Sequence, residues 1–203
     1  MLSYIIVIIL GYALGCSSMS LYISKFKGVD IRERGSKNLG ASNAMLVFGW
    51  KHGIAVALHD IGKAALAVIL ARLIFPDLPN AGAVAGVASV LGHIFPFYLK
   101  FKGGKGFASY YGMTLALNWK LGLVIGIIIV VATLVTDYIV VGTTLTITLV
   151  PAYFGISTRH WIMPVILLIA TAVIVYKHRM NYVKIYKGTE IGLRSANRGD
   201  HRA

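Results

Sequence analysis

The sequence predicts an all-α fold, a polytopic integral membrane helix bundle. Of the 203 residues, 57% are hydrophobic and only 13% are charged, and the mean hydropathy is +0.75, which is too apolar for a soluble domain of this length. Several apolar runs approach the roughly 20 residues needed to cross a hydrocarbon core. Because backbone groups in lipid must be hydrogen-bonded internally, we expect these runs to be helices.

The helices are expected to form one transmembrane domain over residues 1–203. The apolar runs lie at 2–23, 52–75, 81–98, 106–117, 121–156 and 161–176. No repeat, low-complexity tract or flexible linker separates them. The first run lacks an early basic cluster and a small-residue cleavage site, so it is interpreted as a retained span rather than a signal peptide.

The number of spans follows from where the basic residues fall. Most of the 20 lysines and arginines are concentrated in three segments, 25–51, 100–105 and 177–202. Basic residues in short loops mark the cytoplasmic side, so these segments should share that side. Two counts satisfy this condition, with the N-terminus outside and the C-terminus cytoplasmic. Seven spans result if the long run 121–156 breaks near Asp137, and five if it does not break and 106–117 does not cross. Seven is preferred, because the long run exceeds what a bilayer requires.

The net charge of +13 is compatible with nucleic acid, anionic lipid or an anionic substrate as partner. Its concentration in short segments between apolar runs favours the membrane and an anionic substrate, and no nucleic acid is expected. Cys16 is the only cysteine, which excludes a disulfide framework and a cysteine-based zinc site. No metal and no cofactor are expected.

The first basic segment contains a loop dense in small and polar residues, DIRERGSKNLGASN at 30–43. Its candidate ligands are the hydrogen-bonding side chains of Ser36, Asn38, Ser42 and Asn43 and the cations Arg32 and Arg34. An ordinary turn that caps the next helix is the alternative. The length of the loop and its place just before a span favour substrate binding.

An ionisable cluster, HDIGK, lies inside the apolar run 52–75. Asp60 and Lys63 are three residues apart and therefore share a helix face. Charged groups at membrane depth usually pair or serve a site. A supporting ion pair of Asp60 with Lys63, or with a loop cation, is preferred to a catalytic role.

A third segment, GHIFPFYLKFKGGKG at 92–106, combines lysines with glycines after an apolar run. Gly103, Gly104 and Gly106 can adopt positive φ and present N–H groups to an anion next to Lys105. This pattern predicts phosphate binding at a membrane surface, and anchoring by snorkelling lysines is the alternative. The residue after Lys105 is glycine rather than Ser or Thr, so the pattern is not a nucleotide-binding P-loop.

The fourth segment, KHRMNYVKIYKGTE at 177–190, follows the last span. His178 and Asn181 share a face if the helix continues beyond the membrane. His178 could then act as a base or bind a phosphate, and Asn181 could donate to an oxyanion or a hydroxyl. A basic tail attracted to anionic lipid is the alternative. Together the four segments suit a substrate that carries phosphate and a lipid-like tail.

Nearly the whole chain resembles the bacterial acyl-phosphate:glycerol-3-phosphate acyltransferases of the PlsY type. The resemblance rests on four elements that occur in the family's order. They are Asp30-Ile31-Arg32 with Gly35-Ser36-Lys37-Asn38-Leu39-Gly40-Ala41-Ser42-Asn43; Asp60 and Lys63; Gly92-His93, Phe95-Pro96 and Phe101-Lys102-Gly103-Gly104-Lys105-Gly106; and His178, Asn181 and Gly188-Thr189-Glu190.

The chain also departs from the family pattern. Leu46 stands where the family usually has an arginine, and a leucine cannot bind phosphate, so another cation such as Arg34 or Lys37 must compensate or activity is weakened. The other departures are Ser42 in place of Thr, Lys177 and Lys184 in place of Arg, and Tyr182 in place of Ile.

The resemblance implies transfer of a fatty acyl group from acyl phosphate to the 1-hydroxyl of glycerol 3-phosphate. The products are 1-acyl-glycerol 3-phosphate (lysophosphatidic acid) and phosphate, in the first step of phospholipid synthesis. The enzyme is expected to be a monomer in the bacterial plasma (inner) membrane, with its active site facing the cytoplasm.

The resemblance also implies which residues form the site. Those expected to take part in catalysis are Ser36, Asn38, Lys105, His178 and Asn181. Those expected to bind substrate are Arg34, Lys37, Gly40, Ser42, Asn43, His93, Lys102, Gly103, Gly104 and Glu190, with Asp60 and Lys63 in support.

We hypothesise that Lys105 and the amides of Gly103 and Gly104 hold a phosphate. Acyl phosphate is already activated, so Ser36 is expected to orient a substrate rather than attack it. The hydroxyl proton goes either to His178 or to the donor's own phosphate.

Three observations bear on other functions. The His-x-x-x-x-Asp signature of acyltransferases that use thioesters is absent, which argues against a coenzyme A ester as donor. A transporter for a phosphorylated metabolite is the alternative from another class, but no matching polar set occurs on the opposite face or through the spans. A basic membrane anchor without chemistry would leave the polar motifs unexplained.

Overall fold

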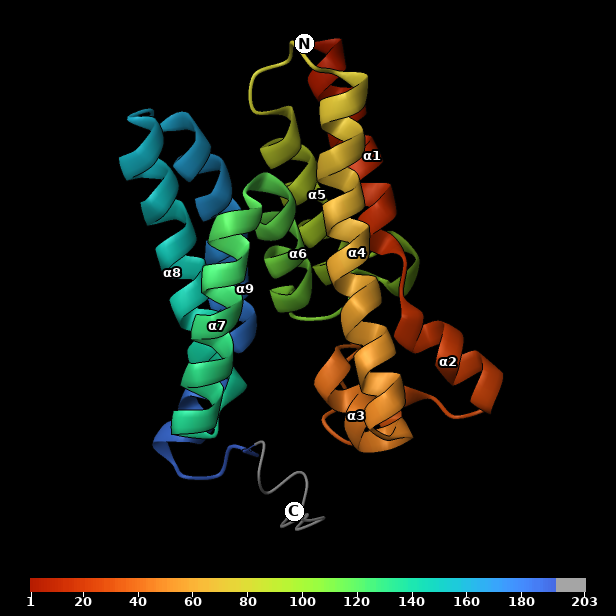
Figure 1. Ribbon diagram of the computed structural model, residues 1–203. Coiled ribbons are helices and arrows are strands. Elements are labelled where there is room, and N and C mark those ends of the chain that lie inside the picture. The colour runs from red at the N-terminus through yellow and green to blue at the C-terminus, as the bar shows by residue number, and fades with distance from the viewer. Residues whose placement is uncertain (193–203) are drawn as a thin grey trace. The chain divides into compact units, whose positions relative to one another are not determined.

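The computed structural model describes residues 1–192, which form two compact units, one at Met1–Leu117 and one that begins at Asn118 (Figure 1). All regular structure in the described residues is helical. The predicted single domain over 1–203 stays a prediction. The basic residues Arg194, Arg198 and Arg202 of the expected tail lie outside the described residues.

The first unit contains six α-helices and two short 3₁₀ helices. These are α1 (Leu2–Cys16), α2 (Met19–Lys27), η1 (Ile31–Glu33), α3 (Ala41–Phe48), α4 (Trp50–Ile74), α5 (Ala81–Ile94), η2 (Phe97–Leu99) and α6 (Phe107–Leu117). Helix α4 packs against α1, α3, α5 and α6, and α1 lies along α5. The run 2–23, expected as one helix, is interrupted, because α1 ends at Cys16 and α2 begins at Met19, although both fall in one candidate span, Leu2–Lys27.

The second unit contains α7 (Trp119–Thr136), α8 (Ile139–Thr158) and α9 (Ile162–Tyr186). Helix α8 packs against both α7 and α9. Asp137 ends α7 in a left-handed conformation with φ 70°, and α8 starts two residues later. The predicted break of the run 121–156 near Asp137 is therefore confirmed.

By length and composition, six segments within residues 1–192 can cross a membrane. They are Leu2–Lys27, Trp50–Ile74, Ala81–Leu99, Trp119–Thr136, Ile139–Thr158 and Ile162–Tyr186. Helix α6, with 11 residues, is shorter than a usual span. The chain is thus an all-helical polytopic membrane bundle.

The end of α6 is held by a residue of α4. Arg72 donates from Nη1 to the carbonyl of Ala116 at 2.8 Å and from Nη2 to that of Leu117 at 3.2 Å. A cation at the last carbonyls of a helix satisfies acceptors that have no partner within the helix and complements its dipole. The last turn of α6 therefore lies at the level of Arg72 along α4.

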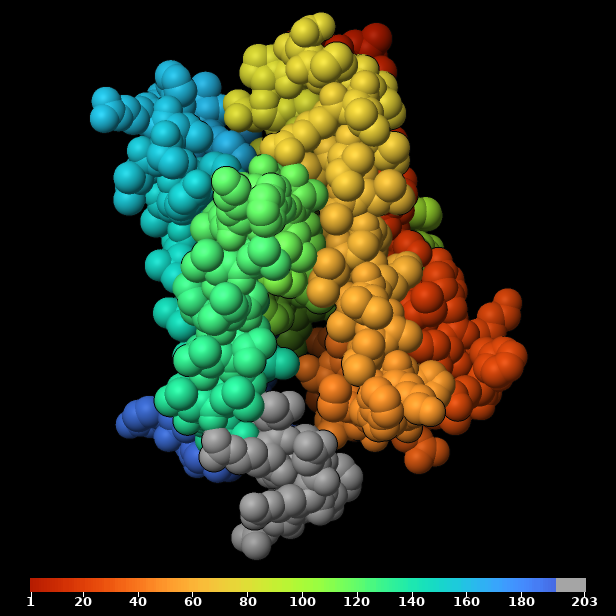
Figure 2. All heavy atoms as spheres, viewed as in Figure 1, coloured from red at the N-terminus to blue at the C-terminus, as the bar shows by residue number. Residues whose placement is uncertain are grey.

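Exposed apolar side chains cover the outer faces of the helices. Ile69 and Leu73 of α4 are 46% and 72% exposed, and Ile127 and Val135 of α7 are 65% and 76% exposed. Figure 2 shows the outer face of α4 within the first unit. Such surfaces are stable in contact with lipid tails, which agrees with the membrane assignment.

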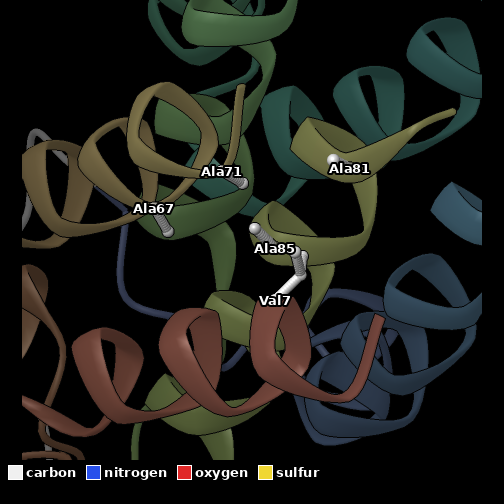
Figure 3. Packing of buried hydrophobic residues seen from close by; sticks show 5 residues of the cluster. All are labelled: Val7, Ala67, Ala71, Ala81 and Ala85. Atoms are coloured by element: carbon white, nitrogen blue, oxygen red, sulfur yellow. The ribbon is translucent and has the colours of Figure 1, made fainter. Parts of the chain in front are cut away.

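Helix α1 contacts α5 through small residues. A Cβ added at Gly11 would lie 2.3 Å from the carbonyl oxygen of Ala85, and one added at Gly15 would lie 2.1 Å from that of Ser89. Small residues four apart allow this close approach of membrane helices. Around the same contact, small apolar side chains of α1, α4 and α5 form a buried cluster (Figure 3), which comprises Val7, Ala67, Ala71, Ala81 and Ala85.

Substitution Gly15→Ala is expected to destabilise the protein by about 1 to 3 kcal/mol, because the new methyl group meets the backbone of Ser89 and α5 must shift. Gly62→Ala in α4 is the matched control, since its added Cβ meets nothing within 4 Å and alanine favours a helix by up to about 1 kcal/mol. Thermal unfolding in detergent, followed by circular dichroism, measures both. Equal midpoints for the two variants would contradict the close α1–α5 contact.

Candidate active site

Asn43 organises the loop at 30–43 from inside. Its side chain is buried at the start of α3, and its Oδ1 accepts the N–H of Ser36 at 2.7 Å. Its Nδ2 lies 2.8 Å from the carbonyl oxygen of Asn38 and 3.1 Å from those of Ile31 and Arg34. The amide of Asn43 is thus used within the loop. Its predicted contact with substrate is corrected to a role in shaping the loop that presents Ser36.

Two backbone features complete this loop. Gly35 has φ 55°, and a Cβ there would lie 2.3 Å from Asn43 Oδ1, so both conformation and space require glycine. Asn38 Oδ1 accepts the N–H of Gly40 at 2.7 Å, in an Asx turn that leads into α3. The predicted ligands whose side chains are exposed on this loop are Arg32, Arg34, Ser36, Lys37 and Ser42.

The cations of this loop differ in how they are engaged. Arg32 donates to the Asp30 carboxylate, with Nη2 2.6 Å from Oδ2, and this hydrogen bonding holds the pKa of Asp30 below its usual range. Leu46, at the position of the family's arginine, is half-buried in α3. The exposed Arg34 and Lys37 are therefore the residues of this loop that can supply the missing charge.

The glycines at 103 and 104 lie against the end of α5. The N–H of Gly103 donates to the carbonyl of Ile94 at 3.0 Å, and that of Gly104 donates to the carbonyl of His93 at 3.1 Å. A Cβ at Gly103 would lie 2.2 Å from the His93 carbonyl oxygen, and one at Gly104 would lie 2.0 Å from His93 Nε2. The prediction that these two amides hold a phosphate is therefore wrong, because both already donate to the backbone. The glycines are needed for close approach.

The loop at 100–106 reverses the chain between α5 and α6. Lys100 and Phe101 have φ of 53° and 60°, and Gly106 has φ 92°. Lys102 is exposed, whereas Lys105 is half-buried directly after the glycine that contacts His93. That Lys102 and Lys105 bind a phosphate stays a prediction.

The predicted pair of Asp60 and Lys63 is confirmed. Lys63 Nζ lies 2.8 Å from Asp60 Oδ1, and both side chains are buried. Lys63 also donates to the carbonyl of Ser17 at 2.7 Å and lies 2.9 Å from His93 Nδ1. His59 Nε2 lies 3.0 Å from Ser17 Oγ. This buried cluster connects α4 to the break between α1 and α2 and to the end of α5.

In the second unit, the predicted residues lie on α9 and the turn after it. His178 is buried, and its Nδ1 lies 2.9 Å from the carbonyl oxygen of Ile174. A carbonyl only accepts, so Nδ1 carries the hydrogen and a neutral ring has its lone pair on Nε2. Asn181 Nδ2 donates to Glu190 Oε1 at 2.5 Å, because Gly188, with φ 67°, turns the chain back after α9.

The structure thus brings the predicted residues together in three groups. The first is the loop 30–43, the second is Asp60, Lys63 and His93 with the loop 100–106, and the third is His178, Asn181 and Glu190. Sequence reasoning missed Ser17 and Tyr98, whose hydroxyl donates to the carbonyl of Cys16 at 2.6 Å. The Cys16-Ser17-Ser18 sequence was the available signal for a break in the first helix.

Comparison with known proteins identifies the family. The family model for glycerol-3-phosphate acyltransferase matches residues 5–188. The chain belongs to the glycerol-3-phosphate acyltransferase family. A glycerol-3-phosphate acyltransferase 1 of Oceanobacillus iheyensis is 36% identical over 205 residues, which cover 95% of this chain and 96% of that protein. A glycerol-3-phosphate acyltransferase of Dinoroseobacter shibae is 38% identical over 180 residues, covering 88% and 87%.

Solved structures of this acyltransferase family agree with the assignment. The crystal structure of PlsY (YgiH), an integral membrane glycerol 3-phosphate acyltransferase, in its glycerol 3-phosphate form has a TM-score of 0.89 and 28% identity, and the match covers 96% of this chain and 98% of that one. The lysophosphatidic acid form has a TM-score of 0.84, with 94% and 95% covered. The chain is therefore an integral membrane acyltransferase of phospholipid synthesis that produces lysophosphatidic acid.

Proposed function

We propose that this acyltransferase takes its acyl group from an acyl phosphate and transfers it to the 1-hydroxyl of glycerol 3-phosphate. The observation that carries the proposal is Lys105, a half-buried cation in a loop whose glycines are fixed against His93. Donor and acceptor both carry phosphate, and a positioned cation offsets their charge and repulsion. The absence of the His-x-x-x-x-Asp signature supports a donor other than a thioester.

In the first unit, Lys105 binds a substrate phosphate, and the loop 30–43 binds through its exposed side chains. Ser36 donates its hydroxyl to a substrate oxygen, and its backbone is fixed by Asn43. Arg34 and Lys37 supply the charge that Leu46 cannot. An activated donor needs no covalent enzyme intermediate, so Ser36 orients rather than attacks.

In the second unit, His178 accepts the proton. The 1-hydroxyl oxygen attacks the acyl carbonyl carbon, its proton passes to the Nε2 lone pair of His178, and the bond from that carbon to the phosphate oxygen breaks. Phosphate departs with the bonding electrons. Asn181, held by Glu190, donates to the oxyanion formed on the way.

We also propose that the chain crosses the bacterial plasma membrane seven times. The N-terminus then lies outside, and the basic segments lie on the cytoplasmic side. The break at Asp137 divides the long run into two helices, each long enough to span. Helix α6 is then the crossing that must be added to the six long segments. It is short, and its end is held by Arg72. Only an odd number of crossings places the segments 25–51, 100–105 and 177–202 on one side.

A donor-specificity assay tests the proposed reaction. Purified protein is expected to release phosphate from palmitoyl phosphate only when glycerol 3-phosphate is present, and to form no lysophosphatidic acid from palmitoyl coenzyme A. Product formation is followed by thin-layer chromatography with labelled glycerol 3-phosphate. Equal product from the thioester would refute the proposed donor.

A further inference from the structure

The ammonium group of Lys63 has a complete set of partners at membrane depth. Its three hydrogens face the Ser17 carbonyl at 2.7 Å, Asp60 Oδ1 at 2.8 Å and His93 Nδ1 at 2.9 Å. An ammonium donates three hydrogen bonds and accepts none. Such a buried cation is stable only when it is paired and fully hydrogen-bonded. The side chain of Lys63 therefore fixes three groups relative to one another.

Two groups lie at His93 Nδ1, the ammonium of Lys63 at 2.9 Å and Asp60 Oδ1 at 3.3 Å. The shorter of these contacts is the one to Lys63, which only donates, so Nδ1 accepts there and a neutral ring bears its hydrogen on Nε2. Nε2 is the atom that faces Gly104, since a Cβ there would lie 2.0 Å from it. The carbonyl of the same histidine accepts the Gly104 N–H at 3.1 Å. Both the ring and the backbone of His93 thus set the place of the residue before Lys105.

We propose that Lys63, with Asp60 as its counterion, is a positioning residue that acts through His93 to place Lys105 for phosphate binding. The proposal rests on the proposed role of Lys105. Lys63 holds the imidazole by Nδ1, the imidazole and its carbonyl hold Gly104, and Gly104 fixes the backbone from which Lys105 extends. Lys63 also donates to the carbonyl of Ser17, which directly follows α1. This hydrogen bond ties the lysine side chain to α1 as well as to its own helix, α4.

The sharpest test is a double-mutant cycle. Asp60→Asn and Lys63→Met are introduced together, so that no buried charge is left unpaired. This paired variant is expected to lower kcat/KM by about 100-fold, the effect of misplacing a catalytic group by about 1 Å. In a Lys105→Ala background, the same pair should lower kcat/KM by less than about threefold further, because its effect passes through Lys105. Lys51→Met, an exposed lysine near the start of α4, is the matched control and should leave kcat/KM unchanged.

The outcomes separate the two proposals. The paired variant and Lys105→Ala each lower kcat/KM by some factor. If the combined variant shows the product of the two factors, the positioning role of Lys63 is overturned and the role of Lys105 is left intact. Normal activity of Lys105→Ala would instead overturn the proposed role of Lys105. Nitrogen-15 NMR of the His93 ring gives a second measurement on the unaltered protein. A hydrogen on Nε2 is expected, and a hydrogen on Nδ1 would overturn the proposal even if the paired variant does not fold.

Discussion

Substitution of Lys105 by alanine is expected to lower kcat/KM for glycerol 3-phosphate-dependent phosphate release by about 100-fold to 1000-fold. The side chain is a half-buried cation that follows two glycines held by the carbonyls of His93 and Ile94, and we propose that it binds a substrate phosphate. Removing one such fixed donor commonly costs a factor of this size. Release of phosphate from palmitoyl phosphate by purified protein measures it.

Two further variants make the Lys105 result specific. Lys105→Arg keeps the positive charge and should retain more activity than Lys105→Ala. Its activity should still be below normal, because a planar guanidinium is larger than the ammonium group that it replaces. Lys27→Ala removes an exposed cation at the end of α2 and should leave kcat/KM unchanged. If Lys105→Ala kept more than half of the normal kcat/KM, the phosphate site would have to lie elsewhere.

Substitution of His178 by alanine is the second large effect, with an expected loss of about 100-fold to 10,000-fold in kcat and little change in KM. The bond from Nδ1 to the Ile174 carbonyl leaves Nε2 as the basic nitrogen, and general-base catalysis typically contributes a factor of this size. Steady-state kinetics with varied glycerol 3-phosphate separates the two constants. Imidazole added to His178→Ala should restore part of kcat.

His160→Ala is the control for this experiment, because His160 is exposed in the connection between α8 and α9. It should behave like the unaltered enzyme. A variant of His178 that keeps its kcat but has a raised KM would show that this residue binds substrate, and the donor's own phosphate would then be the proton acceptor.

Much of the fold follows from composition and spacing. The apolar runs located the helices, and the length of the run 121–156 together with Asp137 predicted the break between α7 and α8. The break after Cys16 was missed because Ser17 and Ser18 are a weak signal inside an otherwise apolar run. The groups that satisfy the broken backbone, Tyr98 and Lys63, lie far away in sequence. Only their placement in three dimensions makes an interrupted helix stable in a membrane.

In the site, too, contacts between residues close in sequence could be predicted, and contacts between residues far apart in sequence could not. The pairing of Asp60 with Lys63 followed from helix periodicity, which depends on local spacing alone. The amides of Gly103 and Gly104 were assigned to a phosphate because their type and spacing suit one. The structure gives them to carbonyls of α5 instead, and no local pattern reveals such a competing acceptor. Asn43 was misassigned for the same reason.

The contact of Lys63 with His93 has a consequence for the route of the substrates. About 20 Å of helix separates Trp50, the first residue of α4, from Lys63, so the loop that bears Lys105 is level with the middle of α4 rather than with its end. If the donor is the acyl phosphate that we propose, its acyl chain can lie in the hydrocarbon beside α4 while its carbonyl reaches this loop. Glycerol 3-phosphate dissolves in water, so it is the substrate that must reach this level from the aqueous side.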